Sequence, residues 1–165
     1  MNKQVLDPCC GARMFWFDKY DDRVEFCDIR SEEHELKDGE KLRHLDIKPD
    51  TIIDFRSMPF GDDTFYHVVF DPPHMTSLGK NSWMARKYGR LDGTWENDIK
   101  AGFSECFRVL KPGGTLIFKW NEYDIPLKQV LKLTDYKPMY GHRSGKQQKT
   151  HWVAFIKSQS DKGEL

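Results

Sequence analysis

The chain has 165 residues, with 26 basic and 26 acidic side chains, 38% hydrophobic residues and 13% aromatic residues. This length suits one domain with a single core, and the composition excludes a wholly disordered chain. The apolar runs, such as residues 153–156, are far shorter than the ~20 residues of a membrane-spanning helix, so we expect no membrane partner.

The cysteines and the start of the chain bear on the cellular compartment. Residues 1–4 show no apolar signal-peptide pattern. Cys9, Cys10, Cys27 and Cys106 fit no CxxC or zinc-ligand spacing, and a disulfide between the adjacent Cys9 and Cys10 would be strained. We therefore predict a reduced, cytoplasmic protein without a metal site; no sequence signal indicates its oligomeric state.

Charge is divided unevenly along the chain. Residues 1–75 carry 10 basic and 17 acidic side chains, whereas residues 76–165 carry 16 basic and nine acidic ones. Either the two halves face different partners, or the segregation along the sequence does not survive folding.

Short apolar runs alternate with turns and helical patterns, which predicts an open α/β sheet. The predicted strands cover residues 3–7, 24–28, 51–54, 67–71 and 115–120, and a helix over 95–110 begins at the N-cap Thr94. A final antiparallel pair is predicted at 136–142 and 151–157. We expect one domain over 1–157 and a flexible tail over 158–165.

Four of the first five strands end in aspartate, at Asp7, Asp28, Asp54 and Asp71. Ligands of doubly wound sheets bind at this edge, although aspartate is also a good helix N-cap. The turn after the first strand holds one glycine, Gly11, and not the three of a dinucleotide site, which favours an adenosine ligand without phosphates. Asp28 is placed to accept the ribose hydroxyls, while Asp54 accepts the adenine amine beside the apolar ring of Phe55.

The fourth strand leads into Asp71-Pro72-Pro73-His74. With this motif, the chain resembles the class I S-adenosylmethionine-dependent methyltransferases of the amino-methylating group, which carry DPPY or NPPY here and a DPFxGxG-like turn after the first strand. The resemblance spans roughly residues 3–157. It is strongest to small phage and bacterial DNA methylase-like proteins with DPCCG, DPPH and KWNE-like strings. It implies a Rossmann-like fold of three layers, with a mostly parallel sheet and an antiparallel final strand.

The resemblance also implies S-adenosylmethionine as cofactor and assigns site residues. The predicted cofactor contacts are Asp7, Pro8, Cys9, Gly11, Asp28, Ile29, Asp54 and Phe55. The predicted catalytic residues are Asp71, Pro72, Pro73 and His74, because a carboxylate and a neighbouring peptide carbonyl can hold an exocyclic amine while a planar ring stacks on the base. His74 stands where the group usually has Tyr, Phe or Trp, and Arg13 where it often has glycine.

The expected acceptor is an exocyclic amino group of adenine or cytosine in DNA or RNA. Predicted substrate contacts are Trp83, Lys119, Asn121, Arg143 and Lys146. The long segment 74–93 is expected to form a lid, with Arg86, Lys87 and Tyr88 on a phosphate-contacting rim. Two alternatives stay open: methylation of a protein side-chain amide or small amine, and a non-catalytic nucleic-acid-binding module with this fold.

Overall fold

The computed structural model describes residues 3–38 and 40–158. The strands are β1 (Val5–Asp7), β2 (Val24–Asp28), β3 (Glu32–Asp38), β4 (Lys41–Ile47), β5 (Thr51–Ile52), β6 (Phe65–Phe70), β7 (Leu110–Asn121), β8 (Tyr140–Ser144) and β9 (Thr150–Ile156). The helices are α1 (Trp83–Tyr88), α2 (Trp95–Val109), α3 (Leu127–Val130) and the 3-10 turn η1 (Leu131–Leu133). None of the helices in these ranges is long and apolar enough to span a membrane.

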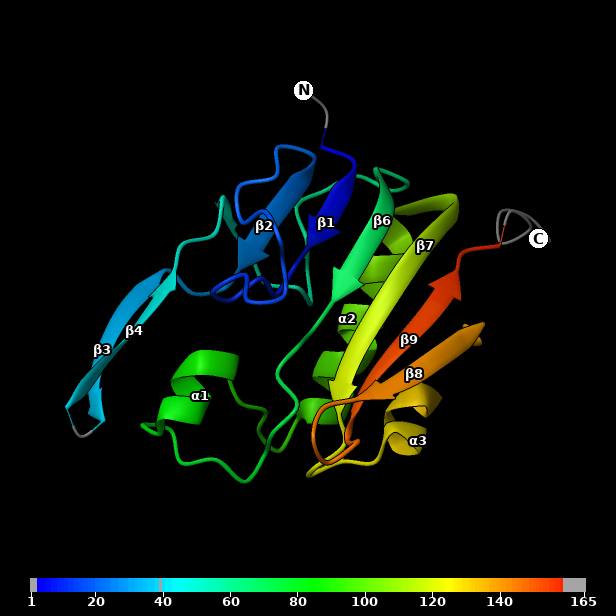
Figure 1. Ribbon diagram of the computed structural model, residues 1–165. Helices are drawn as coiled ribbons and strands as arrows, with labels where there is room; N and C mark the ends of the chain where they lie inside the picture. Colours follow the sequence, from blue (N-terminus) through cyan, green and yellow to red (C-terminus); the bar gives the residue numbers. More distant parts are fainter. Residues whose placement is uncertain (1–2, 39, 159–165) are drawn as a thin grey trace.

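Seven strands form one sheet in the order β5-β2-β1-β6-β7-β9-β8 (Figure 1). The first five are parallel, and β9 lies antiparallel between β7 and β8. The predicted α/β sheet with an antiparallel final strand is therefore confirmed. Because the chain order reverses between β1 and β6, the loops that follow these two strands diverge and leave room for a ligand at the carboxyl edge.

The main core lies between the sheet and α2. Ile99, Phe103 and Phe107 of α2 are buried against the sheet residues Phe118 and Phe155. The helical spacing of its apolar residues gave the position of α2 to within one residue. Thr94 precedes the helix as predicted, although its side chain makes no capping hydrogen bond.

The two faces of the sheet are covered differently. In the described part of the chain, α2 and α3 lie behind the sheet, and the irregular segment 8–23 covers the front of β1 and β2 in place of a helix (Figure 1). Its Cys10 and Trp16 pack on Val24 and Phe26 of β2. Irregular backbone therefore covers this part of the front face.

Arg13 shapes this loop. It adopts φ +53°, a left-handed conformation that favours glycine, which accounts for the glycine that the resembled group often has here. The guanidinium lies 4.1 Å from the Phe26 ring centroid and donates to the carbonyl of Lys48 and to Asp50. These contacts hold segment 8–23 against the sheet and offset the strain at Arg13.

The sequence did not predict β3, β4, α1, α3 or η1. β3 and β4 form an antiparallel hairpin that extends from the sheet beyond β2, and α1 lies in the predicted lid segment beside it (Figure 1). Other boundaries shifted: β7 begins at Leu110, so the Lys111-Pro112-Gly113-Gly114 turn lies within its range, and β8 begins at Tyr140, four residues later than expected. The domain over 1–157 stays a prediction, and residues 159–165 of the expected tail lie outside the described residues.

Candidate functional site

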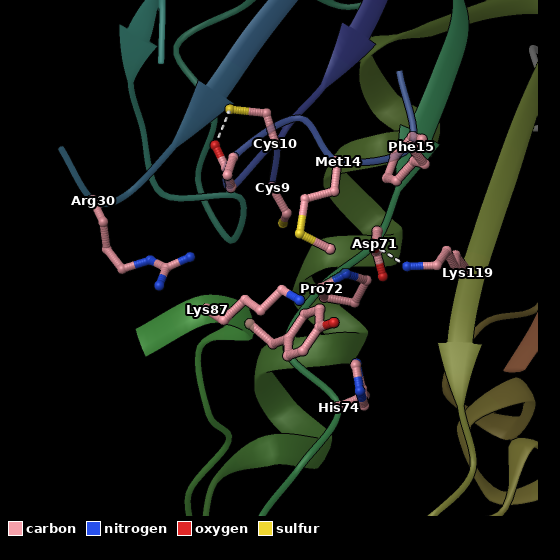
Figure 2. Close-up of a pocket in the computed structure, with 13 residues that line it drawn as sticks. Cys9, Cys10, Met14, Phe15, Arg30, Asp71, Pro72, His74, Lys87 and Lys119 are labelled. Carbon is pink, nitrogen blue, oxygen red and sulfur yellow. Dashed lines mark hydrogen bonds and ion pairs between the residues drawn. The ribbon is translucent and has the colours of Figure 1, made fainter. Parts of the chain in front are cut away.

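The carboxyl ends of β1, β2 and β6 meet around a cavity of about 450 Å³. Figure 2 shows the side chains that surround it. We call it the central cavity; its lining is Cys9, Cys10, Gly11, Ala12, Met14, Phe15, Arg30, Asp71, Pro72, His74, Lys87, Tyr88 and Lys119. The sheet edge thus joins the turn after β1 to the DPPH motif after β6, as the sequence predicted.

Two further cavities share walls with the central one. The inner cavity, about 330 Å³, is lined by Pro8, Cys9, Asp28, Ile29, Arg30, Phe55, Asp71, Pro73 and Tyr88. The outer cavity, about 470 Å³, is lined by Asp71, His74, Met75, Met84, Tyr88, Lys119, Asn121 and Thr150. Asp71 and Tyr88 border all three, so Asp71 lies where the inner and outer spaces meet.

Asp28 closes the inner cavity from the end of β2. Its carboxylate accepts the backbone N–H of Gly11 at 3.0 Å and that of Arg30 at 2.9 Å. The Arg30 side chain pairs with the same carboxylate at 3.1 Å and also donates to the carbonyl of Arg86 in α1. Asp28 therefore links the β1 turn to β2, and Arg30 connects this acidic group to the lid segment.

Asp7 was predicted to contact the ligand, but it lies beneath the site. Its carboxylate is fully buried and accepts from the Trp16 indole N–H at 2.8 Å and the Cys9 backbone N–H at 3.2 Å. Burial raises the pKa of Asp7 to about 7, and the nearby Asp71 and Asp28 contribute in the same direction. Asp7 shapes the turn that carries Cys9, and it does not line the central or inner cavity.

Asp71 forms an ion pair with Lys119, at 2.6 Å between Oδ2 and Nζ. Lys119 reaches it from β7, as the dashed line in Figure 2 marks. The ammonium lies 5.3 Å from the ring centroid of Phe15 and 5.6 Å from that of Trp152. These aromatic faces stabilise the cation and fix its position beside Asp71.

His74 is buried, with 9% of its surface exposed. Its ring centroid lies 5.9 Å from Tyr88 and 6.1 Å from Trp120. Burial lowers the pKa of His74, so the imidazole is neutral at neutral pH. The ring borders both the central and the outer cavity, which keeps one side of it at the predicted acceptor site.

Several predicted residues lie elsewhere. Asp54 forms an ion pair with Arg56 at 2.7 Å, and Arg56 forms a second one with Asp98 at 3.0 Å. Asp54 therefore does not line the inner cavity, whereas the adjacent Phe55 does. Arg143 lines a separate cavity between β8 and α3, and Lys146 lies exposed in the loop after β8. Trp83 begins α1 but does not line the three cavities.

Some residues that line the central cavity were not predicted as cofactor or catalytic residues. Lys87 and Tyr88, expected on a phosphate-contacting rim, face the central cavity, as do Met14, Phe15 and Arg30. A signal for Arg30 exists in the sequence, because it follows Asp28 by two residues, within reach of its carboxylate. Lys87 and Tyr88 reach the cavity only because segment 76–90 folds back over it.

Comparison with known proteins gives the fold. No protein-family model matches the sequence, and no curated protein does. Among solved structures, the PH0226 protein of Pyrococcus horikoshii OT3 is similar over 96% of this chain and 83% of its own, at 16% identity and a TM-score of 0.55. The [4+2]-cyclase SpnF matches 95% of this chain and 76% of its own, at 12% identity and a TM-score of 0.50. Together with the strand order, these likenesses show a Rossmann-like α/β fold.

Proposed function

We propose that the protein is an S-adenosylmethionine-dependent methyltransferase that acts on an exocyclic amino group of a nucleobase in DNA or RNA. One observation carries this proposal: Asp71 stands on the wall common to the inner, central and outer cavities. A carboxylate at that junction faces a cofactor on one side and an acceptor on the other.

The residues of the inner and central cavities fit the cofactor. The carboxylate of Asp28 can accept ribose hydroxyls, and the Phe55 ring supplies an apolar wall for adenine. Gly11 has φ +50°, a left-handed conformation that favours glycine in the turn lining this corner. The cofactor, when bound, supplies an electrophilic methyl group on a sulfonium sulfur.

Asp71 and Pro72 would act on the amine. A base amine is a poor nucleophile because its lone pair is delocalised into the ring. Asp71 and the Pro72 carbonyl accept hydrogen bonds from its N–H groups, which favours a geometry with the lone pair directed at the methyl carbon. As the N–C bond forms and the C–S bond breaks, the amine releases one proton to Asp71 or to water.

Lys119 and His74 define the surroundings of that amine. Lys119 donates a hydrogen bond to Oδ2 of Asp71, so the amine would donate to the other carboxylate oxygen or share Oδ2 with Lys119. His74 offers a neutral ring edge beside the acceptor, with less stacking area than Tyr or Trp. Asn121, whose amide donates to Thr150 at 3.1 Å, adds a polar group to the outer cavity.

The experiment measures transfer of a radiolabelled methyl group to single-stranded DNA, duplex DNA, RNA and lysate protein. We expect label in a nucleic acid, and a loss of about 100-fold or more in the variant Asp71→Asn, because the amide cannot stabilise the developing positive charge. Asp22→Asn, an exposed substitution, is the control. Wild-type turnover in Asp71→Asn would refute the mechanism, and cofactor binding without transfer would favour a non-catalytic module.

The packing of His74 favours a second class of acceptor. His74 is packed against Tyr88 and Trp120, which limits its free face for a purine or pyrimidine. A small amine or a protein side-chain amide needs no such face and can use the same Asp71 and Pro72 oxygens. Label found in lysate protein or in a small-molecule fraction, with nucleic acids unlabelled, would select this candidate.

A further inference from the structure

Lys87 reaches the middle of the central cavity from the segment that covers it. The residue lies in the last turn of α1, and Figure 2 shows its side chain extending between Arg30 on one side and Asp71 on the other, with Met14 opposite. The end of α1 is held close to the DPPH motif, because a Cβ on Gly89 would lie only 2.8 Å from the Pro73 ring.

Three cations line the central cavity, and they differ in their partners. Arg30 is paired with Asp28 at 3.1 Å, and Lys119 with Asp71 at 2.6 Å. Among residues 3–38 and 40–158, no carboxylate oxygen lies within 4.0 Å of Lys87 Nζ, which lies 4.9 Å from the centroid of the Tyr88 ring. Lys87 is thus the lining cation that can take an external anion without breaking an ion pair.

We propose that Lys87 binds the carboxylate of the amino-acid portion of S-adenosylmethionine. This inference rests on the proposed function and extends it to the end of the cofactor for which the sequence offered no partner. With the adenosine placed by Asp28 and Phe55, the amino-acid portion extends into the central cavity. A carboxylate there must exchange water for a cation, and the acidic side chain of Asp71 disfavours it on the wall that Asp71 forms.

The placement has a structural consequence. Lys87 belongs to segment 76–90, whose base is closed by the backbone hydrogen bond from Leu91 to Met75 at 2.9 Å. A carboxylate bound by Lys87 therefore also holds α1 over the cavity. An analogue without the carboxylate would fill the adenosine part of the site and leave this link unmade.

The test compares binding of S-adenosylmethionine and decarboxylated S-adenosylmethionine by calorimetry. The second ligand keeps the adenosine, the sulfonium and the amine and lacks only the carboxylate. We expect Lys87→Met to weaken binding of S-adenosylmethionine about 10- to 100-fold and to leave the decarboxylated ligand unaffected. Lys87→Arg should recover most of the affinity, and Lys80→Met, an exposed change in the same segment, should have no effect.

The possible failures are distinguishable. If the wild type binds neither ligand, the proposed function fails. If the wild type binds S-adenosylmethionine and Lys87→Met binds it equally well, the assignment of Lys87 is wrong. Equal weakening of both ligands would also overturn it, because that result reports a general change in the site. Circular dichroism of each variant establishes that it is folded.

Discussion

At the scale of single residues, one local pattern occurs three times with different outcomes. Asp21, Asp28 and Asp54 are each followed two positions later by arginine, and each carboxylate accepts both the backbone N–H and the Nε–H of that arginine. Of these three carboxylates, Asp28 alone lines the inner cavity. The sequence predicted carboxylates at strand ends, but it could not tell Asp28 from Asp54, because Asp98 on distant α2 binds Arg56 and fixes that pair outside the site.

Asp7 gives a pH-dependent prediction at this scale. Its pKa rises from 3.8 in the unfolded chain to about 7 in the fold. The folded protein therefore keeps a proton that the unfolded chain has lost, and this contribution to stability, complete below pH 4, disappears as the pH rises to 7. Relative to wild type, Asp7→Asn should gain in its free energy of unfolding between pH 4 and 7, by at most about 4 kcal/mol.

Urea denaturation of both proteins from pH 4 to 8 measures this difference. The amide also changes the hydrogen bonds with Trp16 and Cys9, but that effect is the same at every pH and only offsets the curve. Asp22→Asn, at an exposed position, should give a flat difference. A flat difference for Asp7→Asn as well would mean that Asp7 is ionised in the fold throughout this range.

At the scale of elements, long apolar patterns were predictable and short polar elements were not. The apolar runs gave β2 and α2 almost completely. The β3–β4 hairpin was missed because its strands are mostly charged, although Asp38-Gly39 is a turn signal between them. The six residues of α1 carry little periodic signal, and its place over the cavity depends on contacts such as Arg30 with the Arg86 carbonyl, 56 residues apart.

The covering segment 76–90 is fixed at its start by Asp124, which lies after β7. Its carboxylate accepts the backbone N–H groups of Thr76 at 2.7 Å and Ser77 at 3.0 Å. Asp124→Ala should raise amide hydrogen exchange across 76–90 several-fold, while global stability falls by about 1–2 kcal/mol, because these bonds hold a surface segment and not the core. Hydrogen exchange with mass spectrometry measures both effects.

Asp135→Ala is the matched control, since Asp135 is exposed and lies outside this contact. Asp124→Asn should behave close to wild type, because both backbone groups donate to Oδ2 and the amide oxygen can take its place. Unchanged exchange over 76–90 in Asp124→Ala would mean that the Met75–Leu91 hydrogen bond and the Pro73–Gly89 contact hold the segment without it.

At the scale of the whole molecule, the sequence predicted the class of sheet, mostly parallel with an antiparallel final strand, but not what covers its front face. The parallel strands β1, β2, β6 and β7 contain apolar runs that need burial, and an alternating order of strands and helical patterns allows few topologies. The cover of the front face was not predictable in this way. It depends on Arg13, whose side chain reaches Lys48 and Asp50 from a loop without regular structure.

Lys157 holds the two ends of the fold together. This buried side chain, which follows β9, donates to Asp63 at 2.9 Å and to the carbonyls of Phe107 and Leu110 at 2.7 Å each, where α2 ends. Lys157→Met keeps the length of the side chain but leaves Asp63 and two buried carbonyls without this donor. We expect the free energy of unfolding to fall by about 3 kcal/mol.

Thermal and urea unfolding should show this loss as a single cooperative shift, because the contact joins the last strand to α2 and to the loop before β6. Lys100→Met, an exposed substitution on α2, controls for the removal of a positive charge and should change stability by less than about 0.5 kcal/mol. If Lys157→Met unfolds like the control, the last strand is held by its pairing with β7 and β8, and the lysine contributes nothing to closing the domain.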